Sequence, residues 1–257
     1  MKYVVACRSP WFWDALAARS GSGDLLRIES PEALTIEALA RFGPRYVFFP
    51  HWSQIVPRAI VERFECVCFH ATPVPYGRGG SPIQNMIVRG HQDTKLTALR
   101  MVAEIDSGPI YLQRPVSLMG NLDEIFIRLS RLTLEMINEM LASEPQPAAQ
   151  QGEPVVFKRR TPAESAIPTD RDLERWFDHI RMLDGEGYPR AFIEVGGMRL
   201  EFARPALRRG YIEATVAISP KDGKRDDDNG SRAISSPHPS PEDPTEISLR
   251  GHDNGPG

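Results

Sequence analysis

The chain has 257 residues, of which 41% are hydrophobic and 25% charged, and its formal net charge is -3 at neutral pH. This balance is typical of a globular protein with a sizeable core, and it offers no electrostatic case for nucleic-acid binding. The apolar runs are too short to cross a membrane, and the N-terminal segment does not have the pattern of a secretory signal.

Expected strands and helices alternate through the first part of the chain. The strands are expected at 1–7, 46–49, 65–69 and 96–105, and the helices at 11–18, 35–42, 56–64, 83–89 and 122–140. Asn121 and Glu124 resemble a capping box at the start of the last helix, whose apolar stripe predicts packing on a sheet. The alternation predicts an α/β fold, a doubly wound, Rossmann-like and mostly parallel sheet.

Composition changes after this alternating region. Residues 144–153 are rich in Pro, Ala and Gln, which predicts a linker between a catalytic domain at 1–143 and a small C-terminal α+β module at 154–218. In that module we expect a helix at 173–183 and a hairpin of strands 190–195 and 198–202. Such sheet modules often pair subunits, so a homodimer is one expectation. Residues 219–257, with six prolines and no aromatic residue, are predicted to be a disordered tail.

Two expected strands are followed at once by side chains suited to proton transfer. His70 follows the strand at 65–69, and Asp106 follows the strand at 96–105. Ligands of open α/β sheets bind beyond the carboxyl ends of strands, so we expect both loops to open on one edge of the sheet. An imidazole beside a carboxylate suits acid–base chemistry at neutral pH. Taken alone, the same residues also fit a structural histidine and an ordinary Asp-Ser-Gly turn.

Other familiar sites have weaker patterns. The glycines of YGRGG do not follow the spacing of dinucleotide-binding loops, and no P-loop lysine accompanies them. The histidines at 51, 91 and 179 are not spaced as metal ligands are. Cys7, Cys66 and Cys68 are an odd number without ligand companions. We therefore expect no metal, and a reducing, cytoplasmic location.

The stretch HATPVPYGRGGSPIQ, residues 70–84, resembles a loop of the folate-dependent formyltransferases. The residues in register with that family are His70, Pro75, Arg78, Gly79, Pro82, Ile83 and Gln84. Thr97 and the turn from Asp106 to Ile110 match the next strand and turn of the family. The segments PRYVFFPHWSQIVPRAIVERF, VFKRRTPAESAIP and GYPRAF are also similar, so the resemblance extends over roughly residues 1–205.

This resemblance implies an N-formyltransferase that uses 10-formyltetrahydrofolate as formyl donor. In the chemistry that the resemblance implies, a primary amine attacks the formyl carbon, and we expect His70 to stabilise the tetrahedral intermediate and shuttle the amine proton, and Asp106 to hold the histidine. The residues expected around the pterin are Gln54, Ile55, Val56, Pro75, Ile105, Ser107 and Gly108. Those expected to contact the amine substrate are Tyr76, Gly77, Arg78, Gly79 and Gln84.

One position departs from the family pattern. Two residues before the histidine the family has an asparagine whose amide donates to the oxyanion, and this chain has Cys68. Loss of one such donor costs about 100- to 1,000-fold in rate, and a thiol is a much weaker donor. Either a backbone amide or Asn85 replaces the donor, or the activity is low or altered. Cys68 is otherwise a buried strand residue, or a nucleophile if its pKa is lowered.

The acceptor amine is the least determined part of this prediction. Residues 151–218 contain eleven Lys/Arg and eleven Asp/Glu, a neutral balance that argues against a tRNA partner. The chain looks most like formyltransferases of nucleotide-linked amino sugars for surface polysaccharides, and the basic residues 158–160 would meet a diphosphate. The alternatives are a methionyl-tRNA formyltransferase-like enzyme, an enzyme acting on a carrier-bound amino acid, or a catalytically degraded relative that binds folate or a sugar nucleotide.

Overall fold

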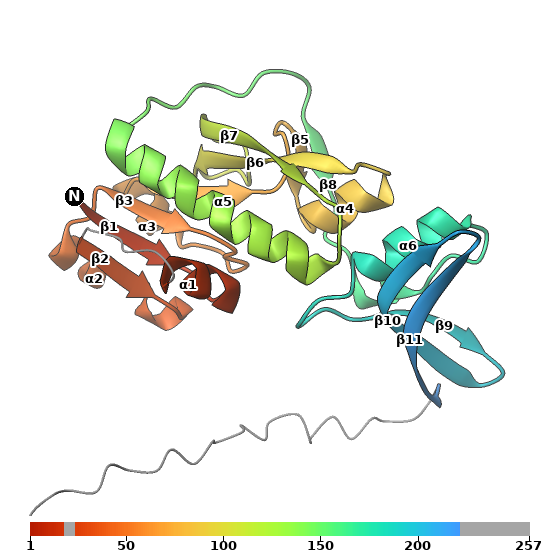
Figure 1. Cartoon of the computed structure of the whole chain (residues 1–257). Helices are drawn as coiled ribbons and strands as arrows, with labels where there is room; N and C mark the ends of the chain where they lie inside the picture. Colours follow the sequence, from red (N-terminus) through yellow and green to blue (C-terminus); the bar gives the residue numbers. More distant parts are fainter. Residues whose placement is uncertain (18–23, 222–257) are drawn as a thin grey trace, which may run out of the picture. The chain divides into compact units, whose positions relative to one another are not determined.

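The computed structural model describes residues 1–17 and 24–221, and within them Met1–Lys221 form one compact unit. A six-stranded sheet of order β2-β1-β3-β4-β6-β7 lies at its centre (Figure 1). Its strands are β1 (Lys2–Ala6), β2 (Asp24–Ile28), β3 (Tyr46–Phe49), β4 (Cys66–His70), β6 (Asp93–Arg100) and β7 (Ile110–Ser117). The first four in spatial order are mutually parallel, whereas β6 is antiparallel to β4, and β7 to β6.

Helices cover both faces of this sheet, as the alternating pattern predicts. They are α1 (Pro10–Ala17), α2 (Ile36–Phe42), α3 (Arg58–Arg63), α4 (Pro82–Val88) and α5 (Leu122–Ser143), with a 3-10 turn η1 at Pro31–Ala33. Successive residues of a strand point to opposite faces, so Val5 packs with residues of α1 and α5 while Val4 packs with residues of α2 and α3. The predicted α/β class and mostly parallel sheet are confirmed.

The long helix α5 begins as the sequence predicts. Asn121 accepts a hydrogen bond from the backbone N–H of Glu124, and the Glu124 carboxylate accepts one from the backbone N–H of Asn121, which completes the capping box. The buried face of α5 includes Leu122, Ile125 and Met140, all from the predicted apolar stripe. In Figure 1 the helix runs across the sheet, and α1 lies against it.

Several predicted boundaries were wrong. Strands β2 and β7 were not expected, and the strand expected at 96–105 is β6 at Asp93–Arg100, followed by a loop at 101–109. The last bonds at this end of β6 run from the backbone N–H of Met101 to Cys66 O, at the start of β4, and from that of Arg100 to Pro109 O. Residue 18 of the first expected helix lies outside the described residues.

The segment predicted to be a linker is tied to the sheet. Ala148 exchanges two backbone hydrogen bonds with Ile110 at the start of β7, and Gln150 binds two loops of the site described below. Beyond it, β8 (Val155–Phe157) pairs in parallel with β5 (Tyr76–Gly79). Pro, Ala and Gln have weak strand propensity, which is why the local pattern indicated a linker although long-range pairing orders the segment.

The C-terminal module contains a 3-10 turn η2 (Pro162–Ser165), a helix α6 (Leu173–Arg181) and an antiparallel sheet of β9 (Ala191–Val195), β10 (Met198–Arg208) and β11 (Tyr211–Pro220). The predicted hairpin is confirmed, with both Gly196 and Gly197 at positive φ in its turn. Strand β11 was missed and extends two residues into the predicted tail; residues 222–257 lie outside the described part. The domain boundaries themselves stay predictions.

No helix among the described residues is long and apolar enough to span a bilayer.

Candidate active site

His70 is the last residue of β4 and is almost completely buried, with 8% of its surface exposed. Its Nε2 lies 2.7 Å from Gly77 O in the loop that follows. Thr72 Oγ1 donates to the same oxygen at 3.2 Å, and Thr97 Oγ1 on β6 donates to Thr72 O at 2.7 Å. The sheet therefore fixes both the histidine and the loop that its ring contacts.

Asp106 lies in the loop between β6 and β7 with a left-handed backbone, φ 53°. Its Oδ2 accepts a hydrogen bond of 2.9 Å from the backbone N–H of Gly79 and lies 3.4 Å from Nδ1 of His70. The loop closes tightly two residues later, because a Cβ on Gly108 would sit 1.8 Å from Arg100 O. Only glycine fits that approach.

The two predicted residues meet, but not for the predicted reason. Because β6 is antiparallel to β4, its end at Arg100 pairs with Val67 near the beginning of β4. The loop at 101–109 has to return along β4 by about three residues, about 10 Å, to bring Asp106 to His70. Direction of pairing, and not a shared edge of strand ends, decides this arrangement.

The contacts of the imidazole define where its hydrogens lie. A carbonyl oxygen only accepts, so Nε2 of His70 carries the hydrogen that binds Gly77 O. A carboxylate also only accepts, so the contact between Nδ1 and Asp106 becomes a hydrogen bond when Nδ1 gains a proton. The pair is thus arranged to receive a proton at Nδ1 beside a negative charge.

Most residues predicted to surround a pterin lie at loops next to this pair. Gln54, Ile55 and Val56 follow β3, which is the parallel neighbour of β4, so the two loops leave the same edge of the sheet. Ile55 is 94% exposed and Ile105 is 71% exposed, whereas Val56 is buried. Pro75 and Gly108 are buried, and Ser107 Oγ donates to Glu104 O. The roles of these residues in pterin binding stay predictions.

Among the residues predicted to contact the amine substrate, Gly77 and Gly79 contact His70 and Asp106 through their backbones. Tyr76 is half-buried, with its hydroxyl 3.3 Å from His91 Nε2, and Arg78 binds Gln150. Gln84 is different. It is buried, and its amide faces Met182 O at 3.5 Å, so in this structure it joins α4 to the C-terminal module and does not open on the site.

Cys68 lies two residues before His70 on β4, so both side chains point to the same face of the sheet. Burial raises the pKa of the Cys68 thiol, and the negative charge of Asp106 raises it further. A nucleophilic thiolate needs the opposite shift, so the direction of this shift argues against that alternative. Asn85 does not replace the missing donor either, because its amide nitrogen donates to Gly80 O and Lys158 O.

Gln150 is the site residue that the sequence pattern missed. Its amide nitrogen donates to Asp106 O at 2.7 Å and to Gly108 O at 2.8 Å. It stands in a Pro-, Ala- and Gln-rich stretch without periodicity, so no local signal separated it from its neighbours.

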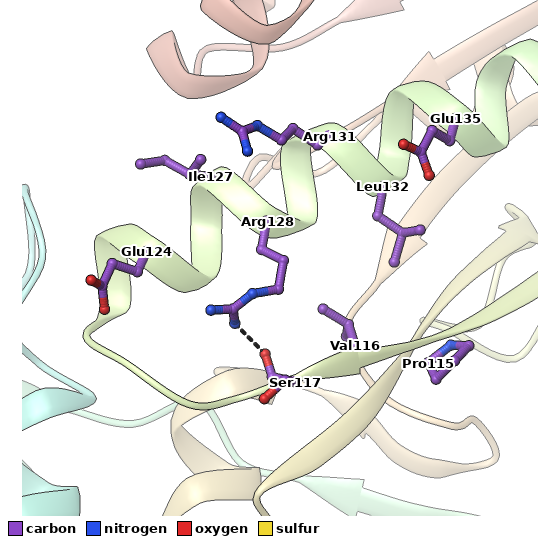
Figure 2. A pocket seen from close by; sticks show the side chains of 9 residues that line it. All are labelled: Pro115, Val116, Ser117, Glu124, Ile127, Arg128, Arg131, Leu132 and Glu135. Carbon is purple, nitrogen blue, oxygen red and sulfur yellow. Dashed lines mark hydrogen bonds between the residues drawn. The ribbon is translucent and has the colours of Figure 1, made fainter.

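Two cavities lie away from this pair. One of about 470 Å³ runs between β7 and α5, where Arg128 donates to Ser117 O and Arg131 extends outward (Figure 2). None of the predicted site residues lines it. A second, of about 280 Å³, is lined by residues of α4, η2 and α6, including Arg160, Arg171 and Arg175. The chemistry of the His70–Asp106 pair, and not cavity size, locates the candidate active site.

No group of three or more His, Cys, Asp or Glu side chains suited to hold a metal ion occurs in the part of the chain that the structure describes.

Comparison with known proteins identifies both parts of the chain. Residues 27–135 match the family model described as formyl transferase, and residues 162–219 match the C-terminal domain of methionyl-tRNA formyltransferase. The solved structure of a methionyl-tRNA formyltransferase from Clostridium thermocellum is 43% identical, with a TM-score of 0.82 over 86% of this chain and 99% of that one.

More distant relatives carry two different names. A methionyl-tRNA formyltransferase from Dechloromonas aromatica is 25% identical over 70% of this chain and 61% of its own length. The chain thus spans about 61% of that relative. A sugar N-formyltransferase from Shewanella shares the fold, with a TM-score of 0.60 and 16% identity over 81% of this chain and 99% of that one. The chain belongs to the folate-dependent formyltransferase family.

Proposed function

We propose that the protein transfers a formyl group from 10-formyltetrahydrofolate to a primary amine, and the contact between His70 and Asp106 is the observation that carries this proposal. The amine nitrogen bonds to the formyl carbon, the carbonyl electrons move onto oxygen, and the bond from that carbon to the folate nitrogen breaks when the intermediate collapses. The amine gives up one proton and the folate nitrogen gains one. His70 carries that proton, and Asp106 stabilises the charged ring.

Family membership supports folate as the donor. One solved protein with this fold, HypX from Aquifex aeolicus, is described in complex with tetrahydrofolic acid, at 16% identity and a TM-score of 0.64. The loops after β3 and around Asp106 offer backbone groups and exposed apolar side chains, such as Ile55 and Ile105. Backbone amides and carbonyls suit the fixed donor and acceptor pattern of a pterin.

The acceptor amine, in this proposal, is carried by a nucleotide-linked sugar. The cavity of about 280 Å³ holds the guanidinium groups of Arg160, Arg171 and Arg175. Its two carboxylates already have partners, because Glu164 accepts from the backbone N–H of Thr161 and Asp178 accepts from Arg181. The arginines also have partners, because Arg160 donates to Glu164 O, Arg175 donates to Val88 O and Arg171 lies 3.6 Å from Asp170. These contacts use only part of the five donors of each guanidinium, and guanidinium groups bind phosphate oxygens with two hydrogen bonds.

This cavity adjoins the catalytic loop. The backbone N–H of Arg160 donates to Ser81 Oγ at 3.1 Å, directly after Gly80, and a Cβ on Gly80 would meet Arg159 at 2.4 Å. Only the segment 159–160 would thus separate a diphosphate in the cavity from the loop that contacts His70. Together with the neutral charge balance of residues 151–218, this favours a small phosphate-bearing ligand.

Methionyl-tRNA is the second candidate acceptor, because relatives at 43% and 25% identity are named for it. The two candidates are separated by incubating the protein with 10-formyltetrahydrofolate and either a panel of nucleotide-linked amino sugars or methionyl-tRNA. We expect a sugar product heavier by one formyl group. Formylation of the tRNA alone would replace the sugar proposal, and no product with any amine, while folate still binds, would indicate a degraded relative.

A variant tests the cavity itself. Arg171→Ala should raise the KM for the sugar nucleotide about tenfold, while the KM for the folate stays unchanged. Arg131→Ala, an exposed arginine on α5 at the other cavity, is the matched control and should leave both constants unchanged. An unchanged sugar-nucleotide KM in Arg171→Ala would remove the cavity from acceptor binding.

A further inference from the structure

The side-chain amide of Gln150 joins the two loops of the active site. On one side its nitrogen donates to Asp106 O at 2.7 Å and to Gly108 O at 2.8 Å. On the other side its oxygen accepts from Nε and Nη2 of Arg78, at 3.0 and 2.8 Å. Both N–H donors and both acceptor positions of this amide are therefore used by hydrogen bonds to the two loops.

The residues that Gln150 holds are those that set the catalytic contacts. Asp106 has a left-handed backbone, a conformation that aspartate tolerates better than most side chains but that is still uncommon outside glycine. Gln150 binds the backbone carbonyl of Asp106, which leaves the carboxylate for Gly79 N and His70. The loop is thus held through its backbone while its side chain is presented to the histidine.

Arg78 occupies the corresponding place on the other loop. It stands between Gly77, whose carbonyl accepts from His70, and Gly79, whose N–H donates to Asp106. Through Arg78, Gln150 therefore holds the three-residue segment that contacts both members of the pair. One side chain sets the separation of the two loops.

We propose that Gln150 is a positioning residue for formyl transfer, which keeps the Asp106 carboxylate directed at His70 by fixing both loops. It touches no reacting atom. The inference rests on the proposed function, because it assumes that the His70–Asp106 pair carries the proton transfer.

The chemistry of the two sides makes the assignment specific to an amide. Two carbonyl oxygens face one end of Gln150 and a guanidinium faces the other, so the side chain has to donate at one end and accept at the other. A glutamate at this position keeps the contact with Arg78. Its second carboxylate oxygen, which cannot donate, faces the two carbonyl oxygens and is repelled by them. Gln150→Glu therefore removes only the hydrogen bonds to the loop that carries Asp106, whereas Gln150→Ala removes the hydrogen bonds to both loops.

The test compares Gln150→Glu and Gln150→Ala with Gln151→Ala, an exposed neighbour of the same residue type. Hydrogen exchange of the Gly79 amide, which donates to Asp106, reports the geometry without need of a substrate. Relative to wild type, we expect this exchange to accelerate about tenfold in both Gln150 variants and to stay unchanged in Gln151→Ala. With the acceptor identified as above, kcat should fall about tenfold or more, and the KM for folate should change by less than about threefold.

The outcomes separate the two proposals. Wild-type Gly79 protection and wild-type kcat in Gln150→Glu would overturn the positioning role. A kcat loss matched by equal unfolding of the whole domain, seen as faster exchange in β1 and β3 as well, would also overturn it. If wild type formylates no amine while Gly79 loses protection only in the Gln150 variants, the proposed function fails and the structural link from Gln150 to Asp106 stands.

Discussion

The two halves of the central sheet contribute differently to the site. The parallel strands β2, β1, β3 and β4 are short, are covered by helices on both faces and deliver His70 at a strand end. The antiparallel strands β6 and β7 are longer, and they deliver Asp106 from the loop that joins them. The parallel half is a general scaffold, and the antiparallel pair places the carboxylate that contacts His70.

The difference shows how one carboxylate reaches a buried histidine. A parallel neighbour of β4 would end at the same edge as His70, and its loop would lie beside the ring at once. Since β6 runs the other way, the loop at 101–109 has to travel back along β4 and needs anchors on the way. Met101, Gly108 and Gln150 provide those anchors. The following changes test each half separately.

Removing either member of the pair should have the largest effect. We expect His70→Ala and Asp106→Ala each to lower turnover by about 100- to 10,000-fold, because general acid–base catalysis contributes rate factors of that size. Circular dichroism should show an intact fold in both variants, since His70 is the last residue of its strand and Asp106 lies in a loop. A rate within a few-fold of wild type in either variant would exclude that residue from proton transfer.

The tight return of the 101–109 loop is tested at Gly108. A Cβ there would lie 1.8 Å from Arg100 O, a backbone atom that cannot move alone. Gly108→Ala should therefore destabilise the fold by about 4 kcal/mol or more, in the range that marks a specific steric conflict. Urea unfolding measures this value. Gly43→Ala, at a helix end with open space around its Cβ position, should cost less, and equal losses in both variants would contradict the steric account.

The parallel half should carry a pH dependence of stability at His51, which follows β3. Burial lowers the pKa of His51 from 6.5 to about 4, and Ser130 Oγ lies 3.0 Å from its Nε2. The unfolded chain then binds more protons than the folded one between these values, so stability is full above about pH 6.5 and falls by about 3 kcal/mol toward pH 4.

Urea unfolding at several pH values measures that slope. His179, whose pKa is also lowered to about 4 by burial, adds a slope of the same sign, so the comparison has to be made between wild type and His51→Gln. His51→Gln should flatten the dependence over this window. An unchanged slope would show that His51 is accessible to protons in the folded state.

Cys68→Asn sharpens the role of the strand that bears the histidine. The variant places an amide donor on the face of β4 that His70 occupies, in a half-buried position. If the chain lacks an oxyanion donor, turnover should rise about tenfold, a part of what one donor contributes elsewhere. Cys68→Ser is the size-matched control and should give a smaller gain. A fall in rate with asparagine would show that the surrounding packing has adapted to the thiol.

The smallest effect is expected far from the site. Asn121→Ala removes the capping box of α5 and should lower the unfolding free energy by about 1 kcal/mol. Turnover per folded molecule should be unchanged, because α5 supplies no residue to the His70–Asp106 contact. A large loss of turnover would show that the scaffold and the site are coupled through this helix.

How much of this could be predicted depends on how local each feature is. The hairpin at Gly196-Gly197, the cap at Asn121 and the strand before His70 follow from neighbouring residues, and the structure agrees with all three. Strand β2 has weaker burial than its neighbours, and β7 lies at the sheet edge, so neither shows a strong apolar pattern. Gln150 depends on contacts with residues more than 40 positions away, which no local pattern encodes.

The amino-acid sequence by itself determined the α/β class and the resemblance to the family, and it singled out His70 and Asp106 as candidates, because caps, turns and motif spacing act over a few residues. The tertiary structure alone decided that β6 runs antiparallel to β4, that the loop at 101–109 folds back, and that Gln150 ties this loop to Arg78. Strand direction and side-chain hydrogen bonds between distant segments depend on which surfaces pack together, and that free energy is a property of the whole core.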